Sequence, residues 1–225
     1  MSEFLKLLPP EDALIKLLAH LPPGATGSET VAIEAAAGRT PAEGIAAPEA
    51  LPPFPRSTVD GYAARAADTF GAGDSLPAYL TVIGEVPMGR AAGLTLNPGQ
   101  VALIHTGGML PEGADAVVML EHTQRSRPGE VEVLKAAGMG ENVLLTGEDV
   151  NPGDVVVAAG QTLRPAEIGG LAGLGIVQVR VARKPRIGIL SSGDEVVPPA
   201  EPLQPGQVRD VNSYSLGALI EQHGG

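Results

Sequence analysis

Cysteine and tryptophan are absent from this sequence, and phenylalanine and tyrosine occur only three times each. The lack of cysteine excludes disulfides, thiolate metal sites and a cysteine nucleophile. The scarcity of aromatic side chains argues against a platform on which the bases of single-stranded nucleic acid could stack. The apolar residues that remain are mainly aliphatic and make up 44% of the chain, which is enough to build a buried core.

Positive charge is also scarce in this chain. It has 15 Lys and Arg residues against 26 Asp and Glu, a formal net charge of −11, which disfavours binding to nucleic acid or to an anionic membrane. No apolar run approaches the ~20 residues that cross a bilayer. The first residues, MSEFLKLLPP, are too short for a signal peptide and include Glu3. We therefore expect a soluble, cytoplasmic protein without a nucleic-acid or membrane partner.

The 30 glycines and 21 prolines separate short aliphatic stretches, which predicts many turns rather than disorder. Helical patterns occur in three places: Pro9 to Leu21, Arg164 to Leu174, and Ser213 to His223 with Asn212 as its cap. Strands are expected at 29–36, 45–47, 62–65, 79–85, 100–105, 116–121, 131–135, 143–145, 155–158, 176–181 and 186–190. The last of these is uniformly apolar and predicts a strand buried on both faces.

These patterns predict a mixed α/β, multidomain chain. Residues 1–50 and 138–182 are expected to form a discontinuous α+β domain, because helical and strand patterns alternate there. Residues 51–137 are strand-rich and predict an inserted β-barrel-like domain. Residues 183–225 contain one strand, a loop and a helix, which is the first βα unit of a parallel, Rossmann-like α/β domain. A lone parallel strand needs neighbours, so we expect the sequence to be truncated inside this domain.

The most distinctive local pattern is residues 52–64, PPFPRSTVDGYAA. Its prolines hold the chain extended, and Asp60-Gly61 is a strong turn signal. Composition alone favours a linker followed by a turn into the next strand. The alternative is a rigid loop that presents the carboxylate of Asp60, beside the hydroxyls of Ser57 and Thr58, to a metal ion or a proton.

A second group of polar residues follows the predicted strand 186–190. Glu195 and the run Ser191-Ser192-Gly193 lie at the carboxyl end of this strand, the edge at which open α/β sheets bind ligands. Hydroxyl and backbone N–H groups of the serines and the glycine are suited to hold an oxyanion. The alternative is a capped loop with solvated acids.

Two further places carry weaker signals. Thr106-Gly107-Gly108 follows the predicted strand 100–105, where a glycine pair permits either a close approach of the backbone to a ligand or a wide turn. Asp149 lies between a predicted strand and a turn, and its simplest interpretation is a turn acid. His105 is interpreted as a strand residue, because no second histidine is near and no zinc-ligand spacing occurs.

Four of these stretches, in this order, resemble the molybdopterin molybdenumtransferase family, which includes bacterial MoeA and the E domain of gephyrin. They are PPFPRSTVDGYA, IHTGG followed by LPEGADAVV, GEDV, and SSGDEV. Val59, Gly108 and Ser192 stand where the family usually has Met, Ala and Thr, and these differences keep size or hydroxyl chemistry.

The resemblance implies Mg²⁺-dependent insertion of molybdate into adenylylated molybdopterin, with release of AMP, in molybdenum cofactor biosynthesis. By the motif matches, the catalytic positions are Asp60, Thr106, Asp149 and Glu195, with Asp60 and Glu195 near the metal. Substrate-binding contacts are expected from Ser57, Gly107, Ser191, Ser192 and Gly193. The resemblance also implies a homodimer in which both chains contribute to one active site.

Two other functions remain open at this point. The chain is alternatively a non-catalytic scaffold of the gephyrin E-domain kind, or a generic all-β binding module. The Gly-Gly-x-Ser-x-Gly pterin loop of the family does not occur in these 225 residues, so we expect this form to be inactive by itself.

Overall fold

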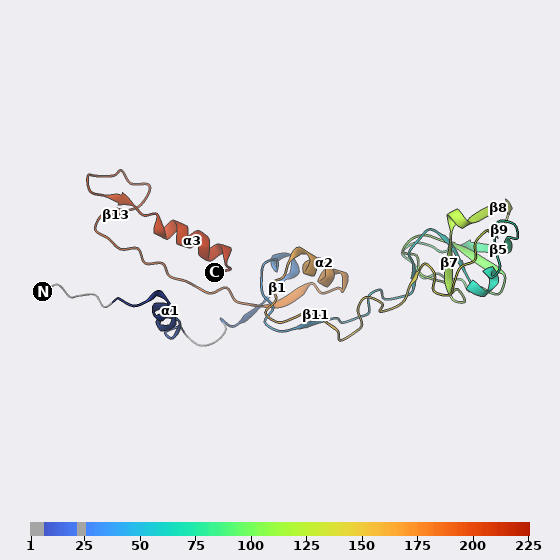
Figure 1. Cartoon of the computed structure of the whole chain (residues 1–225), viewed down its shortest axis with the longest axis horizontal. Coiled ribbons are helices and arrows are strands. Elements are labelled where there is room, and N and C mark those ends of the chain that lie inside the picture. Colours follow the sequence, from blue (N-terminus) through green and yellow to red (C-terminus); the bar gives the residue numbers. More distant parts are fainter. Residues whose placement is uncertain (1–6, 22–25) are drawn as a thin grey trace. The chain divides into compact units, whose positions relative to one another are not determined.

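The computed structural model describes residues 7–21 and 26–225, and Figure 1 shows its elements along the chain. Backbone contacts divide these residues into two compact units. Unit 1 contains the described residues up to Glu43, together with Ala158–Gly169 and Ile176–Gly225, and unit 2 contains Gly44–Val157 and Gly170–Gly175. The domain limits that we expected from the sequence stay predictions, because these units are defined by contacts and not by independent folding.

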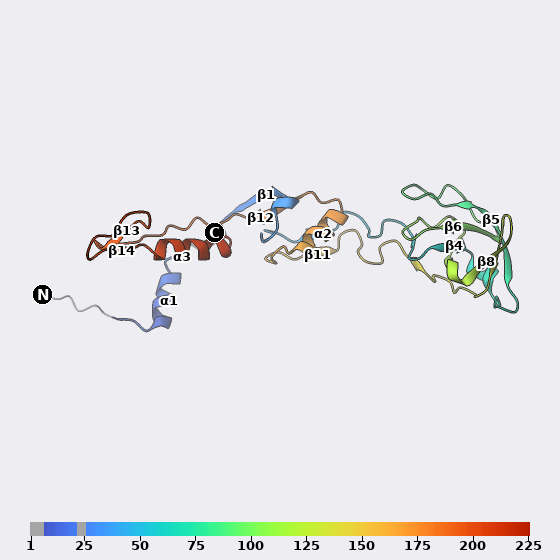
Figure 2. The same ribbon diagram turned by 90° about the horizontal axis from the view of Figure 1, so that it is seen from above.

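Unit 2 is built around a six-stranded sheet with the strand order β7-β4-β6-β5-β9-β8; Figure 2 labels β4, β5, β6 and β8 of this sheet. Its strands are β4 (Gly61–Ala64), β5 (Ala78–Glu85), β6 (Gln100–Ile104), β7 (Ala116–Met119), β8 (Thr123–Arg127) and β9 (Glu130–Val133). Figure 1 labels β7 and β9. Strands β5 and β6 run parallel, whereas the other neighbours are antiparallel. The mixed α/β class with a strand-rich middle is confirmed, and closure of the sheet into a barrel stays a prediction.

Two buried apolar clusters pack against this sheet, and successive residues of β4 alternate between them because side chains along a strand point to opposite faces. Tyr62 and Ala64 of β4 belong to one buried cluster with Val101 and Val118, whereas Ala63 belongs to a second cluster. All four residues of β4 are buried, since this strand lies between β6 and β7. The carboxyl-terminal end of β6 and the start of β4 are therefore anchored on both sides by packed side chains.

Two short antiparallel pairs complete the strands of unit 2. They are β2 (Ile45–Ala46) with β11 (Val155–Val157), and β3 (Arg56–Ser57) with β10 (Val143–Leu144). The one-turn helices η2 (Ala66–Thr69) and η3 (Leu120–His122) also belong to this unit. In each pair, one strand precedes the six-stranded sheet in the sequence and the other follows it.

Unit 1 contains α1 (Pro10–Leu18), η1 (Ile33–Ala35) and α3 (Asn212–Gln222). Its strands pair as β1 (Ser28–Ala32) with β12 (Gln178–Ala182), and as β13 (Val196–Val197) with β14 (Val208–Arg209). Helix α2 (Pro165–Gly173) spans the division between the units. No helix in the described ranges is both long enough and apolar enough to cross a membrane.

The start of α2 shows why the sequence predicts this helix. Pro165 occupies the first helical position, as expected. The carboxylate of Glu167 accepts the backbone N–H of Arg164 at 2.9 Å. Both oxygens of this carboxylate also lie within 3.1 Å of Nε of the Arg164 side chain. The guanidinium hydrogen bonds lower the pKa of Glu167 to about 2. This acid is therefore ionised wherever the helix is folded at ordinary pH.

Several sequence expectations are corrected by the structure, and the strand predicted at 29–36 ends at Ala32, where η1 follows. Residues 186–190 are exposed and form no strand, because no described strand lies beside them to pair with their backbone groups. Asn212 is the first residue of α3 and not its cap; instead, Oδ1 of Asp210 accepts the N–H of Ser213 at 3.0 Å. Strand β8 was missed because TQRSR lacks apolar alternation, which an edge strand does not need.

Gly61 is the first residue of β4, and the turn that the Asp-Gly pair suggested is wrong for this position. Its backbone pairs with Ile104 on one side and Met119 on the other. A Cβ atom built on Gly61 would lie 2.1 Å from the carbonyl oxygen of Val118. Glycine is therefore required because two backbones approach closely, not because of a positive φ.

We expect Gly61→Ala to lower the free energy of unfolding by at least about 2 kcal/mol, because the added methyl group must push two paired strands apart. Urea unfolding measures this change. Gly169→Ala is the matched control: Gly169 is exposed on α2 with open space around its Cβ position, so alanine should stabilise by up to about 1 kcal/mol. A Gly61→Ala protein as stable as the parent would show that the strands do not approach this closely.

Candidate functional site

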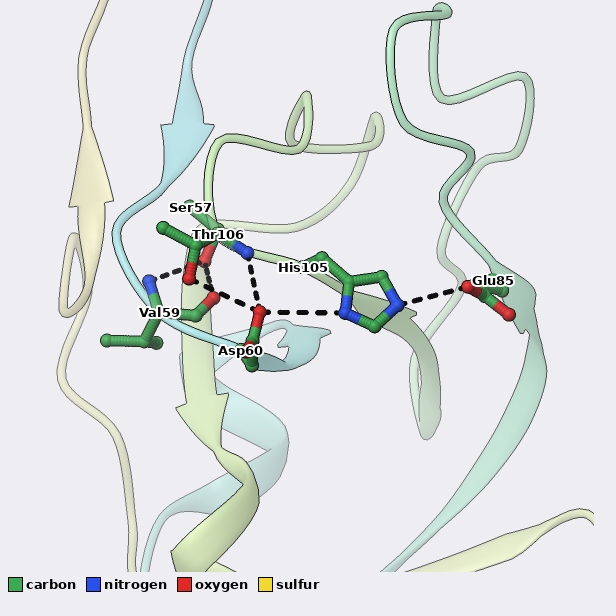
Figure 3. Close-up of polar contacts among 6 residues, drawn as sticks. All are labelled: Ser57, Val59, Asp60, Glu85, His105 and Thr106. Atoms are coloured by element: carbon green, nitrogen blue, oxygen red, sulfur yellow. Dashed lines mark hydrogen bonds and ion pairs between the residues drawn. The ribbon is translucent and has the colours of Figure 1, made fainter.

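The candidate site is formed where β4 begins and β6 ends. The antiparallel register pairs Gly61 with Ile104. Asp60 and His105 are the next residues beyond this pair, so the register carries both to the same end of the ladder. Thr106 follows directly. Two stretches that are 46 positions apart in the sequence thereby meet, as Figure 3 shows.

The carboxylate of Asp60 is held by Thr106. Its Oδ1 accepts the backbone N–H of Thr106 at 2.8 Å and the hydroxyl of the same residue at 3.2 Å. The Asp60 side chain is 56% exposed. These bonds, the backbone one first, lower the pKa of Asp60 below its ordinary value, against a smaller opposing effect of desolvation. The structure therefore brings together two of the four predicted catalytic positions, and it keeps the acid ionised and open to solvent.

His105 lies between two carboxylates, a place that the sequence analysis did not foresee. Its Nδ1 is 3.5 Å from Oδ1 of Asp60, and its Nε2 is 3.1 Å from Oε1 of Glu85. Interpreting His105 as a plain strand residue was wrong: it is the first residue after β6 and its ring joins the site. The sequence did contain a signal, since two predicted strands end in Glu85 and His105, but their parallel pairing was not readable.

Ser57 supports the loop that carries Asp60. Its side chain is buried, and its hydroxyl donates to the carbonyl of Val59 at 2.6 Å and accepts the Val59 N–H at 3.2 Å. The Ser57 carbonyl accepts the N–H of Gly107 at 2.8 Å, and Gly107 has a φ of 84° that favours glycine. Two of the five predicted substrate contacts, Ser57 and Gly107, thus lie near Asp60. The hydroxyl of Ser57 is already hydrogen-bonded within its own loop.

Asp149 is held by backbone hydrogen bonds to the segment Leu51–Pro52, not by β4 or β6. Its N–H donates to the carbonyl of Leu51 at 3.0 Å, and Val150 pairs with the same residue. The N–H of Gly147 donates to the carbonyl of Pro52. Asp149 is exposed. The loop that carries Asp149 is therefore hydrogen-bonded to the chain that leads into Asp60. The backbone of Asp149 itself contacts Leu51.

Unit 1 contains a cavity of about 420 Å³, which is lined by two of its four predicted residues and not by Ser192 or Glu195. Ser191 and Gly193 line it, together with Asp210, Ser213 and Tyr214. Hydrogen bonds from Ser213 lower the pKa of Asp210. Glu195 is exposed, and its carbonyl accepts the N–H of Val208 at 2.8 Å. Sequence reasoning missed Asp210 and Tyr214, because nothing in the chain showed that α3 would return to the Ser191 loop.

Carboxylate oxygens such as those of Asp60 suit a hard cation that substrate phosphates and water also coordinate. In the described parts of the chain, no group of three or more His, Asp or Glu side chains is arranged to hold a metal ion. Asp60 nevertheless offers an ionised, exposed carboxylate. Mg²⁺ commonly takes only one or two protein carboxylates together with substrate phosphates and water, so the donor set fits such an ion.

We expect Thr106→Val to raise the pKa of Asp60 while leaving it below the ordinary value of 3.8. The substitution removes the hydroxyl bond but keeps the larger contribution, the backbone N–H. Because the folded-state pKa is depressed, the Asp60–Thr106 contact is complete above pH 3.8 and is lost as the pH falls through the lowered pKa. The pH dependence of the Asp60 carboxyl ¹³C resonance measures the change. An unchanged or lower pKa in Thr106→Val would contradict this geometry.

Comparisons with known proteins identify the relatives of this chain. The molybdopterin molybdenumtransferase of Nostoc sp. is 40% identical over 197 residues, which cover 88% of this chain and 45% of that protein. The Bacillus subtilis molybdopterin molybdenumtransferase is 36% identical over 218 residues, which cover 96% of this chain and 50% of that protein. The chain therefore spans about half the length of the curated relatives it matches.

The fold is also similar to that of a solved MoeA structure. The crystal structure of the molybdopterin biosynthesis MoeA protein from Pyrococcus horikoshii superposes with a TM-score of 0.89 at 39% identity, covering 98% of this chain and 58% of that one. The family model described as the MoeA N-terminal region (domain I and II) matches residues 8–175. This match covers most of the chain, and the protein belongs to that family.

Proposed function

We propose that the protein containing this chain acts in molybdenum cofactor biosynthesis, as a molybdopterin molybdenumtransferase that inserts molybdate into adenylylated molybdopterin and releases AMP. Family membership and the names of the relatives support the pathway and the reaction class. The observation that carries the proposal is the Asp60–Thr106 pair, which presents an ionised carboxylate at a solvent-open loop. The scaffold and the all-β binding module are less favoured, because the relatives bear the name of a transferase.

The residues of unit 2 give Asp60 its part in this proposal. Thr106 fixes Oδ1, so the second carboxylate oxygen is left to bind a cation or a substrate group. A Mg²⁺ ion bound there would neutralise phosphate charge on the adenylylated substrate. The prolines before Asp60 reduce the freedom of the loop, which favours a carboxylate that is positioned before substrate arrives.

The residues of unit 1 give the proposal its pterin side. The serine-lined cavity with Ser191, Gly193 and Tyr214 offers hydroxyls, backbone groups and an aromatic ring, a mixture suited to a heterocyclic substrate. We assign Ser192 and Glu195, which belong to the same loop, to substrate and metal contacts. Asp149 is assigned to positioning. Because Asp60 and Glu195 belong to different units, we further propose a homodimer whose active site uses residues from both chains.

We expect Asp60→Asn to lower the rate of molybdate insertion by about 10²-fold or more, a common cost of removing one charged contact from a catalytic site. Asparagine keeps the shape of the side chain and an acceptor for Thr106, so the melting temperature should stay within a few degrees of the parent. AMP release from adenylylated molybdopterin with molybdate and Mg²⁺, measured on the protein as the cell makes it, checks the expectation.

Asp74→Asn is the control for this substitution. Asp74 is an exposed acid in a turn of the same unit, between Gly73 and Leu76. Its replacement should leave turnover unchanged. If Asp60→Asn also turned over at the parental rate, the carboxylate would have only a structural part, and the proposed chemistry would lose its principal residue.

A further inference from the structure

We propose that His105 and Glu85 are positioning residues for Asp60, and that Glu85 acts only through the imidazole of His105. The inference rests on the proposed function of Asp60 and adds two residues to it. Figure 3 shows the chain of contacts, in which the ring of His105 lies between the two carboxylates. The distances are 3.5 Å from Nδ1 to Asp60 and 3.1 Å from Nε2 to Glu85.

The contacts to Asp60 all converge on one of its two oxygens. Oδ1 accepts the N–H and the hydroxyl of Thr106, and it is also the atom that His105 faces. The contacts of Thr106 and His105 with the same oxygen restrict rotation of the carboxylate about its last bond. The orientation of the other oxygen follows from this restriction, and that oxygen is the one proposed to meet cation or substrate.

His105 by itself is a poor anchor, because its side chain is 42% exposed. A half-exposed imidazole on the surface of a sheet samples several rotamers unless a second contact holds it. The bond from Nε2 to Glu85 supplies that contact at the far side of the ring. Orientation of a histidine by a carboxylate on its other nitrogen is a common way to fix a ring that serves a functional group.

The backbone is shaped to make this second contact. In the parallel β5–β6 ladder Val82 pairs with Val101, and a regular register would pair Glu85 with Ile104, three positions further along each strand. Instead, the register shifts, and Glu85 pairs with Leu103. Paired residues share a face of a sheet and alternate residues share a face of a strand. The shift therefore moves Glu85 from the face of buried Ile104 to the face of His105. Bulges of this kind commonly re-aim a side chain next to a functional site.

The arrangement fits a brace better than a metal site. The two carboxylates meet opposite nitrogens of one ring, so their oxygens do not converge on a common point. In the described residues, these side chains are not among any group suited to hold a metal ion. The function of the trio is therefore to hold the Asp60 carboxylate in one orientation.

The test follows the backbone amide resonance of Thr106 by NMR in the protein as the cell makes it, since that N–H reports on Asp60 and is not bonded to Glu85. We expect Glu85→Ala to move the resonance upfield, toward a weaker hydrogen bond. Glu85→Gln keeps a hydrogen-bonding partner for Nε2 and should restore most of the parental position. In a His105→Ala background, Glu85→Ala should cause no further change, because the connecting ring is gone.

Glu132→Ala is the matched control, a glutamate of strand β9 in the same sheet that pairs with Tyr79. It should leave the Thr106 resonance where it is. The proposal is overturned if Glu85→Ala leaves the resonance unmoved, or if it shifts the resonance equally with and without His105. His105→Asn, which keeps one donor near Asp60, should lie between the parent and His105→Ala.

Turnover separates this inference from the proposed function. In the protein as the cell makes it, Glu85→Ala and His105→Ala should each lower kcat several-fold with little change in KM, and the double variant should match His105→Ala. If Asp60→Asn itself left turnover unchanged, the proposed function would fail. If turnover required Asp60 but neither kcat nor the Thr106 resonance responded to Glu85→Ala, the brace alone would be wrong.

Discussion

The pairing of Gly61 with Ile104 is the constraint on which the candidate site depends. It sets the register of two short strands, and this register places Asp60 beside Thr106. The close approach of β4 to β7 at Gly61 fixes this register further, because a side chain at that position would force the strands apart. A slip of one residue would turn Asp60 away from Thr106 and move every core side chain of β4 to the wrong face.

The chemistry of the site follows from that placement. A backbone N–H and a hydroxyl stabilise the charged form of Asp60, so an acid near the surface stays ionised without a buried cation. The net charge of −11 is one reason for the proposal of a cation at this site, because a cation would separate the carboxylates from an anionic substrate. Asp60 is held within unit 2, and the cavity beside Ser191 lies within unit 1.

The sequence predicted local features of this fold well and their partners poorly. Helix α2 and strands β5, β6 and β9 were identified within two residues, because proline placement and apolar alternation are local signals. The association of Asp60 with Thr106 came only from the family resemblance, since nothing near either residue specifies a partner 46 positions away. Glu85 was overlooked for a related reason: its role arises from a register shift between parallel strands, which no pattern within β5 reveals.

The central claim is that β4 and β6 hold an ionised Asp60 carboxylate against the backbone of Thr106. The scalar coupling across a hydrogen bond, between the amide nitrogen of Thr106 and the carboxyl carbon of Asp60, measures this contact most directly. The account predicts a coupling that is present at neutral pH and disappears when Asp60 is protonated well below pH 3.8. Absence of the coupling at neutral pH, in a protein whose β4–β6 amides remain protected, would contradict it.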